Sequence, residues 1–215
     1  CIRDRGWISP KAMRNGIIIT VLFACLIGSS LLFYAGWELI IVGLLCVLFA
    51  FLYTTGPYPL SYNGWGDILV IVFFGFVPVG GTYYVQALTW TTDTTIASLI
   101  CGLLIDTLLV VNNYRDREAD ARSGKRTVIV RFGEKFGSYL YLMLGMTASL
   151  LCFWFLFEGH LYAALLPLLY LIPHFLTWKR MVRIHSGKKL NSILGETSRN
   201  MLLMGILLSI GFFLN

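Results

Sequence analysis

The chain has 215 residues, of which 57% are hydrophobic and only 13% are charged. A soluble globular chain carries roughly 25% charged residues, so the composition excludes an ordinary soluble domain and indicates an integral membrane protein. We interpret the formal net charge of +6 as a topology signal and predict no nucleic-acid partner.

Long apolar stretches alternate with short polar segments along the whole chain. Each stretch is close to the ~20 residues that a helix needs to cross the hydrocarbon core of a bilayer. The fold class predicted is therefore all-α integral membrane, a bundle of seven transmembrane helices in a single domain over residues 1–215. The predicted spans are 15–34, 37–53, 67–88, 96–113, 136–157, 160–178 and 197–214.

The charges are divided between the two predicted membrane faces. With seven spans, all 17 Lys and Arg fall on one side or within a turn of it, and the other side holds Glu38, Asp93 and Glu158. The positive-inside rule makes the basic side cytoplasmic. We expect a multi-pass protein of the inner (plasma) membrane, in contact with its lipid bilayer and with its functional loops in the cytoplasm.

The third predicted span begins beside an uncharged, turn-rich loop. That loop contains Tyr53, Tyr58 and Tyr62 together with Gly and Pro residues that favour turns. Asp67 follows near the helix start, where we predict a capping role, because free amides and the helix dipole favour an anion there. Gly75, Pro78 and the glycines around them predict a kink or a close helix contact.

The fourth span leads into the most informative segment of the chain. Asp106 lies inside this span, and an acid within the bilayer indicates a functional role or a hydrogen-bonded packing role. Asn112 and Asn113 end the span, and Asp116 and Asp120 follow four residues apart, which places them on one helix face.

A Gly-Lys-Arg-Thr sequence then follows at residues 124–127. Carboxylates at this spacing suit Mg²⁺, which binds proteins through one or two carboxylates plus substrate phosphates, and the basic residues suit the phosphates. At a membrane surface this combination predicts a lipid diphosphate substrate. The alternative is a solvated loop with ordinary salt links.

Two later polar groups have simple structural interpretations. His174 follows Pro173 and is predicted to be a hydrogen-bonded packing residue. Glu196 and Arg199 are three residues apart on one predicted helix face, which favours a local ion pair.

At the Asn112–Thr127 segment the chain resembles the UbiA superfamily of intramembrane prenyltransferases. The same resemblance includes the stretches around Tyr53–Pro57, Gly66–Asp67 and Gly81–Gln86, and it extends over essentially the whole chain. Within the superfamily the chain is most similar to the branch that prenylates 1,4-dihydroxy-2-naphthoate for menaquinone. The resemblance implies a nine-helix fold with two aspartate-rich motifs.

Only the second of those motifs is present in these 215 residues. The chain begins with Cys1, and we expect that an amino-terminal part with the first motif and two helices is missing. We also expect residues 1–215 alone to be inactive.

The resemblance implies an enzyme, a Mg²⁺-dependent polyprenyltransferase. A polyprenyl group would pass from its diphosphate to an aromatic acid with loss of carboxylate, giving demethylmenaquinone. Asp116 and Asp120 would be the catalytic metal ligands. The implied substrate-binding residues are Asn112, Asn113, Arg117, Lys125, Arg126 and Tyr53.

Two alternatives remain open on the sequence. One is a prenyltransferase for another acceptor, such as hydroxybenzoate, homogentisate or a tetrapyrrole. The other is a secondary transporter with Asp106 and Asp116 on an ion pathway.

Overall fold

The structure, a computed structural model, describes residues 6–214, so Cys1, Arg3 and Arg5 of the predicted basic amino-terminal segment lie outside the described residues. Within these limits the chain forms helices and no strands. The α-helices are α1 (Pro10–Ser29), α2 (Glu38–Thr54), α3 (Gly66–Val70), α4 (Gly81–Ala87), α5 (Thr92–Arg122), α6 (Val128–Leu151), α7 (Trp154–Phe157), α8 (Leu161–Leu165), α9 (Leu171–Ile184) and α10 (Asn191–Phe213). Short 3₁₀ helices join or extend them: η1 (Ser30–Phe33), η2 (Leu60–Tyr62), η4 (Leu166–Tyr170) and η5 (Lys188–Leu190). A π-helix, η3 (Ile71–Gly80), continues α3 into α4.

The helices confirm an all-α membrane protein, and each predicted apolar stretch falls on a helical segment. Six of these segments are long and apolar enough to span a bilayer: Pro10–Phe33, Gly66–Ala87, Thr92–Arg122, Val128–Phe157, Leu161–Ile184 and Lys188–Phe213. The remaining stretch forms α2, which has only 17 residues. At 1.5 Å per residue α2 is about 26 Å long, slightly shorter than a typical hydrocarbon core. The predicted count of seven spans is therefore not confirmed.

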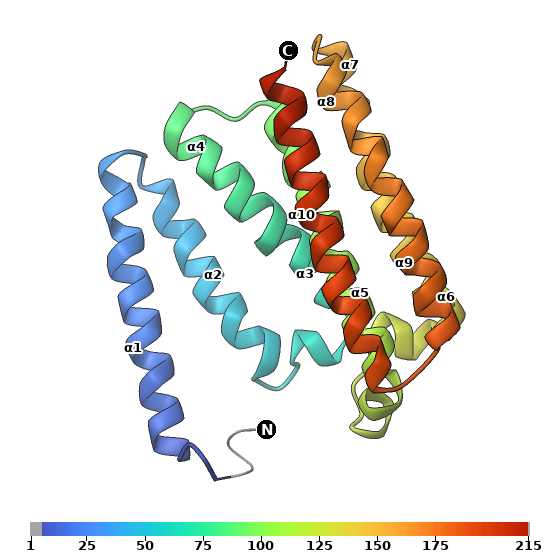
Figure 1. The fold of residues 1–215 in the computed structure, drawn as a ribbon. Coiled ribbons are helices and arrows are strands. Elements are labelled where there is room, and N and C mark those ends of the chain that lie inside the picture. The colour runs from blue at the N-terminus through green and yellow to red at the C-terminus, as the bar shows by residue number, and fades with distance from the viewer. Residues whose placement is uncertain (1–5, 215) are drawn as a thin grey trace.

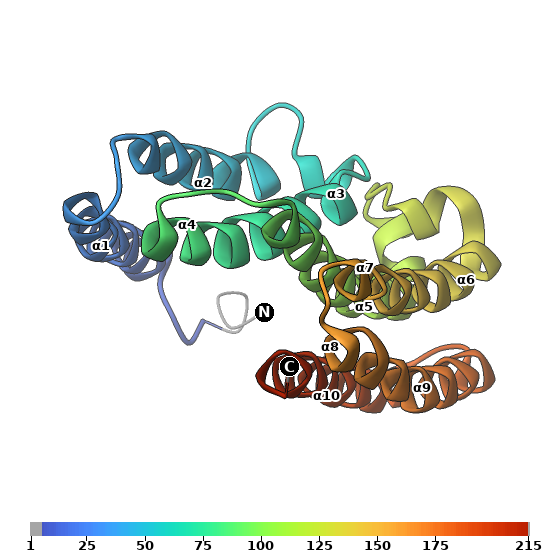
Figure 2. The ribbon, with the colours of Figure 1, turned by 90° about the horizontal axis from the view of Figure 1, so that it is seen from above.

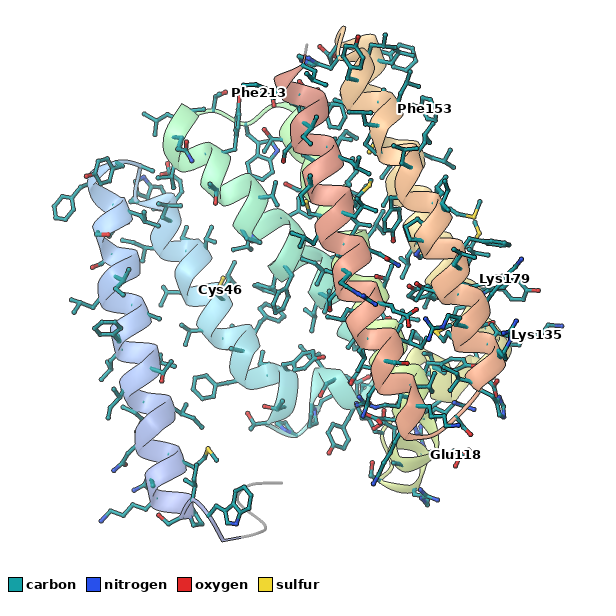
Figure 3. The ribbon with its side chains drawn as sticks, viewed as in Figure 1. Cys46, Glu118, Lys135, Phe153, Lys179 and Phe213 are labelled. Atoms are coloured by element: carbon teal, nitrogen blue, oxygen red, sulfur yellow. The ribbon has the colours of Figure 1, made fainter. Side chains whose placement is uncertain are left out.

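The polar connections gather at one end of the molecule. Figure 1 shows the α2–α3, α5–α6 and α9–α10 connections at the lower end, and the α1–α2, α4–α5 and α7–α8 connections at the upper end. Glu118 lies at the lower end and Phe213 at the upper end (Figure 3). This arrangement agrees with the predicted separation of polar loops.

The core of the protein is built around α5. This helix contains a dozen buried residues, among them Ile100, Val110 and Tyr114, whereas none of the residues of α1 and α2 is buried. Seen from above, α8, α9 and α10 form a row beside α5, α6 and α7, while α1 and α2 lie apart from that row (Figure 2). The exposed apolar surface of α1 and α2 is the surface expected of helices that face lipid.

The predicted close approach in the third span is confirmed. At Gly75 of η3, a Cβ atom would lie 2.5 Å from the carbonyl oxygen of Ser98 and 2.7 Å from the Cα atom of Gly102. Only glycine therefore permits this crossing of η3 over α5. The crossing holds the third span, including α3, against α5.

The buried His174 pairs with polar groups of neighbouring segments. The Tyr170 hydroxyl lies 2.9 Å from Nδ1 of His174, and His174 Nε2 lies 3.2 Å from the carbonyl oxygen of Leu142. His174 is 1% exposed, which confirms the predicted packing role. Such pairing offsets the high cost of polar groups inside a membrane protein.

The predicted local ion pair on α10 is wrong. Glu196 forms an ion pair with Arg180 of α9 at 2.6 Å, and it accepts a hydrogen bond from the Thr177 hydroxyl. Asn200 donates to the same hydroxyl at 3.0 Å. The partner comes from another helix because α9 packs beside α10, a contact that spacing along one helix does not reveal.

Candidate active site

The predicted motif lies at the polar end of α5, which is one continuous helix from Thr92 to Arg122. Asp116 and Asp120 are therefore one turn apart on the same face, as predicted. Asn113 is buried, and the side chain of Asp120 is 14% exposed, compared with 39% for that of Asp116. The two aspartates thus have different surroundings.

A cavity of about 370 Å³ adjoins this end of α5. It is enclosed by the end of α2, the loop before α3, the start of α3, the last turns of α5 and the loop before α6. Its lining residues are Tyr53, Thr54, Ser61, Tyr62, Gly64, Gly66, Asp67, Leu109, Asn112, Asn113, Asp120, Ser123, Lys125 and Thr127.

Two loops that are distant in sequence are tied together beside this cavity. The backbone N–H of Arg126 donates to the carbonyl oxygen of Tyr62 at 2.7 Å. The Arg131 guanidinium donates to the carbonyl oxygens of Asn63 at 2.8 Å and Arg126 at 3.1 Å. Gly64 has a φ of +82°, and a Cβ there would lie 3.0 Å from the Arg126 carbonyl oxygen. These contacts fix the loop that carries Gly64 against the Gly-Lys-Arg-Thr segment.

Asp120 is paired with a lysine inside the cavity. Lys125 Nζ lies 3.2 Å from Asp120 Oδ2, and the backbone N–H of Lys125 donates to the Asp120 carbonyl oxygen at 2.9 Å. The chain turn at Ser123 and Gly124 brings the two side chains together. The cavity therefore contains a carboxylate and an ammonium group in contact, a pair that can separate to bind a metal ion and a phosphate.

Asp116 is held by an arginine outside the cavity lining. Arg115 donates to both carboxylate oxygens of Asp116, at 2.7 and 2.5 Å. It also donates to the side-chain oxygens of Asn112 at 2.7 Å and Asn191 of α10 at 2.9 Å. The guanidinium thus links the aspartate motif to α10, and bidentate pairs of this kind are geometrically specific.

Arg117 belongs to a different cluster, which joins α5 to α6 and to the residue after α9. Its guanidinium lies 3.0 Å from Glu134 Oε2 and 4.7 Å from the centre of the Tyr114 ring. Glu134 also accepts a hydrogen bond from the Tyr114 hydroxyl at 2.7 Å and contacts His185. The Arg117 side chain therefore links α5 to α6 and does not line the cavity.

Asp67 is a cavity residue that lies near a helix start, as predicted, but not at the capping position itself. The residue at the capping position of α3 is Trp65, and Asp67 lies in the first turn. One oxygen of Asp67, Oδ1, is buried and has no hydrogen-bond partner among the described residues. A buried polar atom without a partner is uncommon and calls for a physical explanation.

Asp106 lies beneath Asp67, within the membrane part of α5. It is 1% exposed, and its Oδ1 atom also has no hydrogen-bond partner among the described residues. The seven-residue spacing from Asp106 to Asn113 and Asp120 places all three near one face of α5. Of these three, Asn113 and Asp120 reach the cavity lining.

The donor chemistry of the cavity fits Mg²⁺ that arrives with a phosphate ligand. In the described part of the chain, no three His, Cys, Asp or Glu side chains gather into a group able to hold a metal ion alone. The Asp120 carboxylate and the side-chain oxygens of Asn112 and Asn113 are hard oxygen donors. Mg²⁺ commonly uses one or two carboxylates and completes its shell with water and phosphate.

The structure brings together most but not all of the predicted site residues. Tyr53, Asn112, Asn113, Asp120 and Lys125 line the cavity. Among the described residues, Asp116, Arg117 and Arg126 do not line it.

Sequence reasoning assigned no binding role to several residues that the structure places at the site. The position of Asp67 at the start of a span on the basic side was a usable signal for its role. Arg115 and Thr127 carried no signal of their own beyond their places in the motif. Thr127 lines the cavity and also caps α6 by accepting from the backbone N–H of Val130 at 3.3 Å.

Comparison with known proteins places the chain among prenyltransferases. Residues 3–211 match the UbiA prenyltransferase family. The 1,4-dihydroxy-2-naphthoate octaprenyltransferase of Escherichia coli (strain K12) is 33% identical over 228 residues, covering 99% of this chain and 71% of that relative.

Two further relatives carry the same name. The Haemophilus influenzae protein is 33% identical over 226 residues, covering 98% of this chain and 71% of that relative. The Mycobacterium tuberculosis protein is 37% identical over 145 residues, covering 67% of this chain and 50% of that relative. No solved structure matches the chain significantly.

Proposed function

The chain belongs to the UbiA prenyltransferase family, and from that premise we propose that it transfers a polyprenyl group from polyprenyl diphosphate to 1,4-dihydroxy-2-naphthoate. The names of its relatives support this acceptor. The observation that carries the proposal is the cavity at the polar end of α5, where a carboxylate, two amides and an ammonium group adjoin an apolar membrane span.

The Asp120–Lys125 end of the cavity is the proposed diphosphate site. Lys125 exchanges its ion pair with Asp120 for phosphate oxygens, and Asp120 becomes free to bind the metal ion. Asn112 and Asn113 orient the phosphate oxygens or the metal shell. Mg²⁺, when bound, neutralises the charge of the diphosphate leaving group.

Asp116 requires a rearrangement to take part. Its carboxylate is held by Arg115, so metal binding by Asp116 would free the guanidinium. A freed Arg115 is close enough to the motif to pair with the diphosphate, because it already contacts Asn112. We therefore keep Asp116 as a proposed metal ligand and add Arg115 as a phosphate partner.

The membrane side of the cavity suits the chemistry after diphosphate departs. The bond between the prenyl carbon and the diphosphate oxygen breaks with its electrons on the leaving group, which leaves an allylic cation. The naphthoate ring forms the new carbon–carbon bond, and its carboxylate leaves as carbon dioxide. The product is the reduced form of demethylmenaquinone. Apolar walls exclude water that would quench the cation, and the Tyr53 ring face stabilises positive charge.

The proposed setting is the inner membrane, with the cavity on the cytoplasmic side. The α5–α6 connection beside the cavity carries Lys125 and Arg126, and the positive-inside rule supports this orientation. Polyprenyl diphosphate would reach the cavity from the bilayer, and the water-soluble acceptor would enter from the cytoplasm.

The test is product identification in membranes that contain the protein expressed from its own gene. Polyprenyl diphosphate and Mg²⁺ are supplied with 1,4-dihydroxy-2-naphthoate, 4-hydroxybenzoate or homogentisate, and products are identified by mass. Prenylated and decarboxylated naphthoate is expected. Prenylation of one of the other acids, with none of the naphthoate, would refute the proposed acceptor.

A further inference from the structure

The cavity has two chemically different ends along α5. Asp120 and Lys125 define one end, and Leu109 lies at the other. Eleven residues of continuous helix separate Leu109 from Asp120, which corresponds to about 16 Å along the helix axis. A diphosphate held at the Lys125 end therefore leaves the Leu109 end free for a second ligand.

Leu109, Gly66 and Tyr53 meet at the Leu109 end of the cavity. The backbone of Gly66 faces this end, and a Cβ at Gly66 would lie 3.3 Å from the Leu109 side chain and 3.5 Å from the Tyr53 hydroxyl oxygen. The absence of a side chain at Gly66 leaves room between Leu109 and Tyr53. The Leu109 side chain and the Tyr53 ring offer apolar surface against which an aromatic ring can pack.

The same end contains a carboxyl group whose hydrogen bonding is incomplete. Asp67 lines it with a buried oxygen that has no partner among the described residues, and Asp106 lies behind it with a second such oxygen. Lys125, the ammonium group in the cavity lining, is paired with Asp120 at the opposite end. A hydroxyl group that donates to the unpartnered Asp67 oxygen would complete its hydrogen bonding, which a diphosphate, having only acceptor oxygens, does not do.

We infer that the Leu109 end is the acceptor subsite, where Asp67 accepts a hydrogen bond from a hydroxyl group of the aromatic ring. This inference rests on the proposed function for the identity of the acceptor. In 1,4-dihydroxy-2-naphthoate, the hydroxyl remote from the carboxylate is the one directed to Asp67, because the acceptor's own carboxylate has no proton to donate to that oxygen. The carboxylate then faces Lys125 and the diphosphate end.

The experiment compares Asp67→Asn with Glu118→Gln, a matched change from carboxylate to amide at an exposed position of α5 outside the cavity lining. Turnover in membranes gives KM for the naphthoate and KM for polyprenyl diphosphate separately. We expect Asp67→Asn to raise the naphthoate KM about 10- to 100-fold, the range for losing a hydrogen bond to a charged group. The diphosphate KM stays unchanged, and Glu118→Gln changes neither value.

A second ligand isolates the hydrogen bond itself. 1-Hydroxy-2-naphthoate lacks the remote hydroxyl, so the wild-type protein should bind it about 10- to 100-fold more weakly than the dihydroxy acid. In Asp67→Asn this preference should shrink to a few-fold, because the amide oxygen is a neutral and weaker acceptor. Binding is measured by ligand-dependent thermal stabilisation of the purified protein, which does not require turnover.

The outcomes separate this inference from the proposed function. Equal increases in both KM values, or a preference for the dihydroxy acid that is undiminished in Asp67→Asn, would overturn the acceptor subsite while leaving the prenyltransferase activity intact. Failure of the wild-type protein to bind either naphthoate would also overturn it. Binding of the naphthoate at Asp67 without prenyl transfer would retain the subsite and refute the proposed function.

Discussion

Replacing Gly75 by Ala tests whether the crossing of η3 over α5 holds the cavity in shape. The added Cβ would lie 2.5 Å from the Ser98 carbonyl oxygen, about 0.9 Å closer than the 3.4 Å at which ordinary contacts begin. The obstacle is backbone, which cannot rotate away, so the two helices must separate. Overpacking of this kind costs about 1–3 kcal/mol, equivalent to a decrease of about 2–12 °C in Tm for a protein of this size.

The matched control is Gly81→Ala in the same span, where a Cβ would meet no atom within 4 Å. Alanine is favourable in a helix, so this variant should be as stable as the wild type or slightly more stable. Thermal unfolding of detergent-purified protein measures both variants. Gly75→Ala should also weaken acceptor binding, since Gly75 lies eight residues after Asp67 in the same span. Equal Tm values for the two variants would show that the crossing is loosely packed and would refute this reasoning.

Three further predictions follow from the site and the topology. Asp120→Asn or Asp116→Asn should each lower kcat at least ~100-fold, because each removes charge from an electrostatically stabilised site; normal Mg²⁺-dependent turnover in either variant would contradict the metal assignment. Arg131→Gln removes the side chain that joins the loop before α3 to the loop before α6. It should make the first of these loops more sensitive to limited proteolysis in membranes, whereas an unchanged cleavage rate would show that the backbone link suffices. A cysteine at Asp93 should be labelled from outside the cell and a reporter fused to the carboxyl end should be external; a cytoplasmic signal from either would contradict the proposed orientation.

The helices of this protein were predictable from local sequence. Apolar stretches near 20 residues must be helical in a bilayer, because helices satisfy their backbone hydrogen bonds internally. The same periodicity correctly placed Asn113 and Asp120 on one face of α5, since helix geometry is set by the backbone alone. The glycines of the third span also predicted the close contact at Gly75.

The partners of charged side chains were not predictable in the same way. Glu196 was expected to pair with Arg199 and pairs with Arg180 of α9. Asp116 was expected to face a ligand and is held by Arg115, which also reaches Asn191 of α10. The contacts Glu196–Arg180 and Arg115–Asn191 depend on which helices are neighbours. The Arg115–Asp116 pair lies within α5 and depends on the side-chain conformation of Arg115.

The sequence by itself determined the membrane class, the helix positions, the polar end of α5 and the family resemblance, because hydrophobicity and helical spacing are local properties of the chain. Only the tertiary structure decided that Asp67, Tyr53 and Leu109 share one cavity with Asn113 and Asp120. These residues come from three separate segments, and their meeting depends on the tight η3–α5 crossing and on the loops tied by Arg126 and Arg131. The physical reason is that a cavity is the space left between packed elements, and sequence spacing along any one element does not encode that space.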